Sequence, residues 1–172
     1  MRENLKELQE FVTKMKSTSS LLEKKVIIGN IKDNEFITKA LNYTYDPYKK
    51  YYVTSKTCMK NFNLRDSNYI HDTVFELLDD LNDRTYTGHD AIAMVNAFIN
   101  MNEEYEDLIF SIIDRNMELR ASASVINKVI PGLIPTFDVA LATKYESKFC
   151  DFDNEEWLAS RKLDGVRCII RK

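Results

Sequence analysis

Glycine and proline are scarce in this chain, which has four glycines and three prolines among 172 residues. A β fold with many turns needs such residues, so their scarcity favours helices. The sequence also lacks the roughly 18 consecutive apolar residues that a membrane-spanning helix requires. Its first residues, MRENLKELQEFV, mix charges with apolar side chains and have no signal-peptide core. We expect a protein of the cytoplasm (of the host, if the source is viral) with no membrane partner.

Cysteine and histidine are few as well. Cys58, Cys150 and Cys168 are an odd number and have no C-x-x-C spacing, which indicates reduced thiols. His71 and His89 are too isolated along the chain to suggest a pair of metal ligands. We therefore expect these residues to form neither a disulfide framework nor a metal site.

Neither sign of charge dominates. The chain has 24 Lys and Arg against 27 Asp and Glu, a net charge of -3. This balance argues against a generally basic protein that coats nucleic acid. It leaves room for a local basic patch, because the field at a binding face depends on where the charges lie.

Apolar residues recur at helical spacing through the first 120 residues. The motif STSS at 17–20 offers N-caps for the second of these helices. Residues 54–65 show no period and are interpreted as a basic loop. The predicted helices carry Leu5, Leu8, Phe11, Val12 and Met15; then Leu21, Leu22, Val26 and Ile27; then residues 34–45; then a segment from Asp66 or Ser67 through Leu81; and further segments from Thr87 onward.

The pattern changes after PGLIP at 131–135, where helical periodicity is lost. Two apolar runs, residues 157–159 and 166–170, look like strands joined across Leu163-Asp164-Gly165. The predicted fold is mainly α. An all-helical N-terminal domain (residues 1–133) precedes the first strands of an incomplete α+β domain (residues 134–172).

The stretch SRKLDGVRC at 160–168 places a lysine beside this turn. A lysine amine can act as a nucleophile when a dry pocket or neighbouring cations lower its pKa. Gly165 would leave room for a nucleotide, and Arg167 could anchor a sugar or brace the turn. Taken alone, the same residues also fit an exposed hairpin turn.

Residues Lys162 to Arg167 read K-L-D-G-V-R, which resembles the K-x-D-G-x-R motif of covalent nucleotidyltransferases. That superfamily holds ATP-dependent DNA ligases, RNA ligases and mRNA capping enzymes. Residues 115–148 narrow the choice, because they resemble the join between DNA-binding and adenylation domains in DNA ligases of the T-even bacteriophage type. A fainter similarity covers residues 32–53.

The resemblance implies an ATP-dependent DNA ligase that seals nicks in replication, repair and recombination. Lys162 would be the catalytic nucleophile that becomes lysyl-AMP. Arg167 would contact the ribose, and Ser160 would line the adenine pocket. ATP and Mg²⁺ are the implied cofactors. The family's metal-binding glutamate belongs to later motifs, so we expect residues 1–172 alone to bind DNA without catalysing ligation.

The segment RASASVINK at 120–128 is the candidate DNA-binding segment. Ser122 and Ser124 can cap a helix whose first amides attract phosphate. Arg120, Asn127 and Lys128 would add charge and hydrogen bonds. A capped helix with solvated charges is the alternative. A second basic stretch with interleaved aromatics comprises Lys49, Lys50, Lys56, Lys60 and Arg65 with Tyr48, Tyr51 and Tyr52.

Nicked double-stranded DNA and ATP are the expected partners of a monomeric enzyme, and a sliding clamp stays open as a third partner. Two other functions also remain open at this point. One is another covalent nucleotidyltransferase, an RNA ligase or a capping guanylyltransferase, although a long helical domain ahead of the motif counts against both. The other is a DNA-binding module without catalytic activity.

Overall fold

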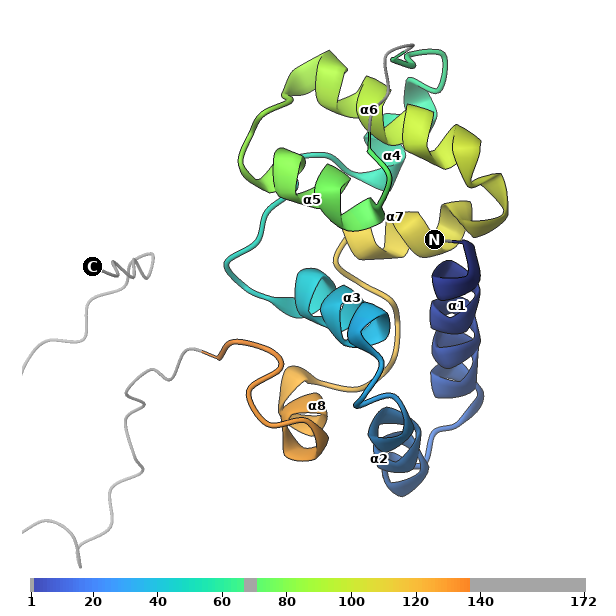
Figure 1. The fold of residues 1–172 in the computed structure, drawn as a ribbon, viewed down its shortest axis with the longest axis vertical. Helices are drawn as coiled ribbons and strands as arrows, with labels where there is room; N and C mark the ends of the chain where they lie inside the picture. The colour runs from blue at the N-terminus through green and yellow to red at the C-terminus, as the bar shows by residue number, and fades with distance from the viewer. Residues whose placement is uncertain (1, 67–70, 137–172) are drawn as a thin grey trace, which may run out of the picture. The chain divides into compact units, whose positions relative to one another are not determined.

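The computed structural model describes residues 2–66 and 71–136, and within these residues all regular structure is helical (Figure 1). This confirms the mainly helical class. The predicted strands lie outside the described residues. The elements are α1 (Arg2–Ser17), α2 (Leu21–Asn30), α3 (Glu35–Tyr45), α4 (Ser55–Lys60), α5 (Val74–Asn82), α6 (Gly88–Met101), the 3₁₀ helix η1 (Glu103–Tyr105), α7 (Glu106–Ile113) and α8 (Ala123–Val129).

Residues Met1–Phe137 form one compact unit. The domain boundary that the sequence predicts after residue 133 stays a prediction. No described helix is long and apolar enough to cross a membrane.

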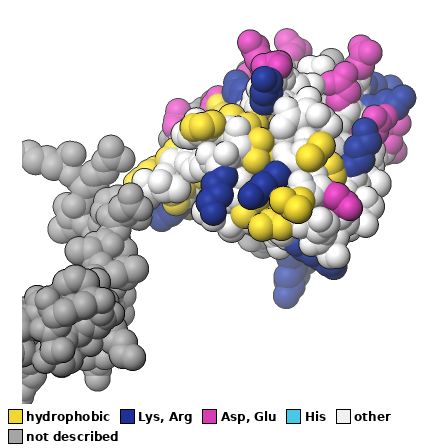
Figure 2. All heavy atoms as spheres, turned by 90° about the horizontal axis from the view of Figure 1, so that it is seen from below, with side chains coloured by type: hydrophobic (Ala, Val, Ile, Leu, Met, Phe, Trp, Pro, Cys, Tyr) yellow, Lys and Arg dark blue, Asp and Glu magenta, His cyan; other side chains and the backbone are white. Residues whose placement is uncertain are grey.

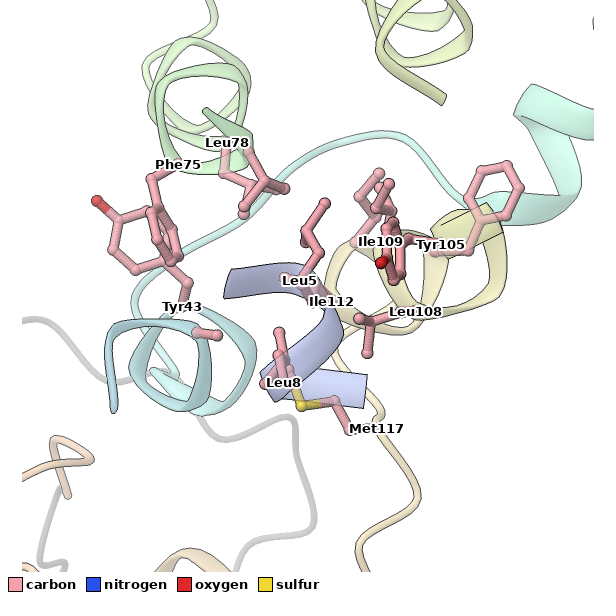
Figure 3. Packing of buried hydrophobic residues seen from close by; sticks show 14 of the residues in the cluster. Leu5, Leu8, Tyr43, Phe75, Leu78, Tyr105, Leu108, Ile109, Ile112 and Met117 are labelled. Carbon is pink, nitrogen blue, oxygen red and sulfur yellow. The ribbon is translucent and has the colours of Figure 1, made fainter. Parts of the chain in front are cut away.

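The first helix supplies the middle of the core. Its buried residues are the five that the sequence pattern predicted: Leu5, Leu8, Phe11, Val12 and Met15. Figure 3 shows Leu5 and Leu8 between Tyr43, Phe75 and Leu78 on one side and Ile109 and Ile112 on the other. The apolar stripe of α1 is therefore the surface against which α3 and later helices pack.

The predicted basic loop at 54–65 is wrong, because α4 occupies Ser55–Lys60. Thr54 and Thr57 form a capping box in which each side chain bonds to the other residue's backbone N–H. The carboxylate of Asp114 accepts a further hydrogen bond, of 2.9 Å, from the backbone N–H of Ser55. These polar contacts start a helix that apolar periodicity alone does not reveal.

The predicted start of the fifth helix at Asp66 or Ser67 is also wrong. The helix begins at Val74, where Thr73 is the N-cap and forms a capping box with Glu76. By contrast, the N-cap residues Ser20 and Thr87 stand where the sequence predicted helix starts. As at α4, a reciprocal capping box sets the start of the helix, and apolar periodicity does not show it.

Candidate nucleic-acid interface

Helices α2 and α8 pack against each other at one end of the helical unit, at the bottom of Figure 1. Gly29 of α2 lies beside Val129 of α8, because a Cβ atom added to Gly29 would lie 3.8 Å from Val129 Cγ1. This packing places the candidate segment 120–128 next to α2, which is 90 or more residues earlier in the chain.

Lys24 of α2 also connects this helix to the segment that precedes α8. Its side chain is buried, with 2% of the residue exposed. Its Nζ donates a hydrogen bond of 2.8 Å to the backbone carbonyl of Leu119 and one of 3.0 Å to that of Arg120. The segment that leads into α8 is therefore bound to α2 through a buried ammonium group.

Arg120 and Lys128 are the predicted DNA-binding residues that the structure leaves exposed as cations. Arg120 has a positive φ of 49° and comes directly before the turn into α8. Lys128 lies in the last turn of α8. Both residues belong to the chain segment that packs beside α2, so the structure brings the two cations to the same end of the unit.

Ser122 occupies the N-cap of α8, but its hydroxyl makes no capping hydrogen bond. Instead, the hydroxyls of Ser122 and Ser124 bond to each other at 2.9 Å, and both residues are exposed. The backbone carbonyl of Ser122 begins the helix by accepting from the N–H groups of Val125 and Ile126. The hydroxyls thus stay at the surface, and α8 is only seven residues long.

Asn127 has a structural role in addition to the DNA contact predicted for it. Its Nδ2 donates to the carbonyl of Ile134 at 2.8 Å, and its Oδ1 accepts from the N–H of Ile134 at 2.9 Å. Ile134 itself is buried. The amide therefore closes the loop that follows α8, and a contact with DNA would have to compete with these two hydrogen bonds.

Helix α2 contributes apolar side chains to this end of the molecule. Leu21, Leu22 and Val26 are 51%, 74% and 63% exposed, although the sequence marked the helix by these very residues. Figure 2, which views the molecule from this end, shows apolar and Lys or Arg side chains together, with acidic side chains mostly towards the margin. We call Leu22, Lys25, Val26, Arg120 and Lys128 the α2–α8 surface.

Sequence reasoning missed the part that α2 plays in this surface. The signal was available in LLEKKVIIG, because its five apolar residues point around the whole circumference of a helix. A short helix in a small unit cannot bury every side, so some of these residues had to be exposed. Which ones are exposed depends on how α2 packs, and the sequence does not give that.

Some residues of the second basic stretch, at positions 48–65, take part in the packing of the helical unit. Tyr51 is buried and its hydroxyl donates a 2.6 Å hydrogen bond to the carbonyl of Tyr43. Lys49 lies 3.9 Å from the centre of the Tyr43 ring and 3.5 Å from a carboxylate oxygen of Asp79. Because the carboxylate of Asp79 accompanies Lys49, this cation is less available to an anion than the sequence suggests.

The predicted catalytic Lys162 and the nucleotide-binding Ser160 and Arg167 lie outside the described residues. In the described residues, no group of three or more His, Cys, Asp or Glu side chains is arranged to hold a metal ion. The described unit presents exposed cations and exposed apolar side chains at its surface.

Comparison with curated proteins gives two similar sequences. The DNA ligases of Enterobacteria phage T4 and of Enterobacteria phage T6 are each 27% identical to the chain over 169 residues. The match covers 92% of the chain. The chain is therefore similar in sequence to DNA ligases of the T-even phages. It spans about a third (33%) of the length of these ligases, and no protein-family profile matches it.

Solved structures show the fold. The chain designated Pmar-Lig_PreS3 superposes with a TM-score of 0.57 at 22% identity, over 74% of this chain and 31% of that one. The chain designated Pmar-Lig_Pre. gives 0.54 at 22% identity, over 71% of this chain and 29% of that one. The arrangement of helices is therefore shared with these structures, and the sequence-predicted resemblance to T-even phage DNA ligases is confirmed by the curated relatives.

Proposed function

We propose that this chain is the part of an ATP-dependent DNA ligase that holds nicked duplex DNA and carries the nucleophilic lysine. The observation that supports it most is the relation to two phage DNA ligases along 92% of the chain. The K-L-D-G-V-R motif at Lys162 supplies the residue that such an enzyme needs for covalent catalysis.

DNA would bind at the α2–α8 surface. Arg120 and Lys128 would neutralise backbone phosphates and release counterions, which gives affinity without regard to sequence. Leu22 and Val26, which are exposed in the free protein, would lie against the sugar faces of a groove, where removal of their apolar surface from water is favourable. Such binding suits an enzyme that must seal nicks in any sequence, because phosphate contacts position a duplex without reading it.

The chemistry of the complete enzyme would proceed in three steps. The amine of Lys162 would attack the α-phosphate of ATP, pyrophosphate would leave, and a lysyl-AMP phosphoramidate would form. AMP would then pass to the 5′-phosphate at the nick, and the 3′-hydroxyl would displace it and form the phosphodiester bond. Arg167 would hold the ribose, and Ser160 would line the adenine pocket. Bound Mg²⁺ would supply charge neutralisation at the phosphates.

Charge-matched variants test the DNA-binding part of the proposal. Arg120→Ala with Lys128→Ala removes two exposed cations from the α2–α8 surface, and Lys6→Ala with Lys14→Ala removes two exposed cations from α1. Fluorescence anisotropy with a labelled nicked duplex should show that the first pair of substitutions lowers the affinity for DNA by on the order of tenfold or more at low salt. The second pair should bind nearly as the wild type does. Equal losses in the two pairs would contradict this location of the site.

The catalytic part is tested in the complete enzyme. Lys162→Ala should abolish labelling by α-labelled ATP, because alanine has no amine to attack phosphorus. Sealing of a nick that already carries 5′-AMP should survive in part, which separates loss of the nucleophile from loss of the fold. Labelling of Lys162→Ala at normal yield would exclude Lys162 as the nucleophile.

A further inference from the structure

We propose that Lys24 is a positioning residue that holds Arg120 and α8 in the geometry that binds DNA. This inference rests on the proposed function, since it concerns how the α2–α8 surface is held. The observation behind it is the position of the Lys24 ammonium group. Lys24 is buried, and its side chain extends from α2 to the backbone just before α8.

A buried ammonium group is costly unless polar partners replace its water. In the described part of the chain, no carboxylate lies within 4.0 Å of Lys24 Nζ, and its observed acceptors are the carbonyls of Leu119 and Arg120. Two consecutive carbonyls must therefore point towards α2. A neutral apolar residue at position 24 would fill the space without orienting them.

The backbone that Lys24 holds is in a conformation that its own residues disfavour. Glu118 has a φ of 53° and Arg120 a φ of 49°. For residues other than glycine the left-handed region is sterically strained. Hydrogen bonds from a charged donor are stronger than those from a neutral one, so the two bonds from Lys24 can offset this strain. Loss of the ammonium group would let the segment relax towards an ordinary extended backbone.

Relaxation at Arg120 would be transmitted to α8, because the N-cap of the helix, Ser122, is two residues later. With seven residues, α8 has little stability of its own and depends on anchors. Its C-terminal half is anchored by Val129 beside Gly29 and by the pairing of Asn127 with Ile134. Lys24 provides the anchor at the other end. Because a helix of seven residues depends on both anchors, loss of Lys24 should displace Arg120 and let α8 shift together with Lys128.

A role in general stability and a role in positioning make different predictions. If Lys24 only stabilises the unit, a folded variant should bind DNA with unchanged affinity. If Lys24 acts through Arg120 and Lys128, removing these two cations should cost little more once Lys24 is gone. A double-mutant cycle measures this coupling.

The experiment compares four proteins, each residues 1–172: wild type, Lys24→Met, Arg120→Ala with Lys128→Ala, and the combination of all three changes. Anisotropy with labelled nicked duplex is measured over a series of salt concentrations, after circular dichroism has shown each protein to be folded. We expect Lys24→Met to weaken binding on the order of tenfold and to lower the slope of log K against log salt by up to about 1.8, the value for two phosphate contacts. The triple variant should bind about as Lys24→Met does.

The outcomes separate the two proposals. If the cation pair weakens binding but Lys24→Met binds as the wild type does, with the same salt slope, the positioning role is overturned and the DNA site stands. Additive losses in the triple variant also overturn it. If the wild type fails to bind nicked duplex even at low salt, the proposed function itself fails.

A second measurement keeps the proposal testable if Lys24→Met does not fold or no DNA binds. Lys24→Gln is a milder change, because glutamine keeps an N–H donor. Its side chain is shorter than that of lysine, so the donor would not reach both the carbonyl of Leu119 and that of Arg120. Hydrogen exchange of the backbone amides of residues 121–126 should be faster in Lys24→Gln than in the wild type, while exchange in α6 should be unchanged. Unchanged exchange across residues 121–126 would overturn the role of Lys24 without reference to DNA.

Discussion

The side-chain amide of Asn127 pairs with both backbone polar groups of Ile134, donating to its carbonyl at 2.8 Å and accepting from its N–H at 2.9 Å. The neighbouring carbonyl of Leu133 accepts a 2.7 Å hydrogen bond from Asn42 of α3. Two asparagines thus fasten the loop after α8 to the helical unit. The residue type at position 127 is explained by this pairing, whether or not the same side chain also touches DNA.

Asn127→Ala should lower the free energy of unfolding by about 1–3 kcal/mol, because it leaves the N–H and carbonyl of Ile134 without their partners. Lys128→Ala, at the neighbouring exposed position, is the control and should change stability by less than about 0.5 kcal/mol. Urea denaturation measures both. A stable Asn127→Ala that has lost DNA affinity would instead show that the amide serves mainly the ligand.

Within α2, the exposed and the buried apolar residues should respond very differently to truncation. Ile28→Ala should destabilise the unit by about 2–5 kcal/mol, since Ile28 is fully buried. Leu22→Ala should change stability by less than about 0.5 kcal/mol, because the side chain is mostly exposed. Similar losses in thermal or urea unfolding would mean that Leu22 is covered by other parts of the protein.

Glycine should be favoured over alanine at position 120. Both substitutions remove the guanidinium group, but only glycine adopts the left-handed backbone of Arg120 without strain. Arg120→Gly should therefore be more stable than Arg120→Ala by about 1 kcal/mol. If unfolding experiments rank alanine above glycine, the positive φ at this residue is not maintained in solution.

The stability of the protein should depend on pH at alkaline values through Cys58. Burial raises the pKa of its thiol from 9.0 to about 11, with the Thr57 hydroxyl opposing the shift. The folded protein keeps this proton when the unfolded chain has lost it, so the stabilisation is present below pH 9 and is lost as pH rises towards 11. Cys58→Val cannot ionise and should lack this decline.

The measurement for Cys58 is the difference in unfolding free energy between the protein and Cys58→Val at several pH values. Ser replaces Cys150 and Cys168 in both proteins, so that only one thiol titrates. Ionisation of tyrosines cancels in the difference, which should shift in favour of Cys58→Val between pH 9 and 11. A difference that stays constant over this range would contradict the buried thiol.

Periodicity predicted the helices whose apolar residues form one stripe. The stripe of α1 was predicted residue by residue, because Leu5, Leu8 and Met15 share one side of a helix. It failed for α4, which is six residues long with Cys58 buried, and which begins through polar contacts of Thr54 and Thr57. Short helices that are defined by caps carry little apolar signal, so they are found from their cap residues.

The candidate site was predictable in part. Arg120 and Lys128 were identified from the sequence and are exposed. Lys24 was not identified, because in a sequence it is one more charged residue on a helix. Its importance depends on contacts with residues 95 and 96 positions away, which follow from packing and not from local pattern.

A salt titration of the binding of residues 1–172 to nicked duplexes tests directly whether the helical unit holds DNA. Two labelled duplexes of unrelated sequence should bind with the same affinity, and log K should fall linearly with log salt as a few phosphate contacts are screened. An intact duplex should compete, since the contacts lie on the backbone. If neither duplex binds even at low salt, the helical unit is not the part that holds DNA, and our assignment of the α2–α8 surface is wrong.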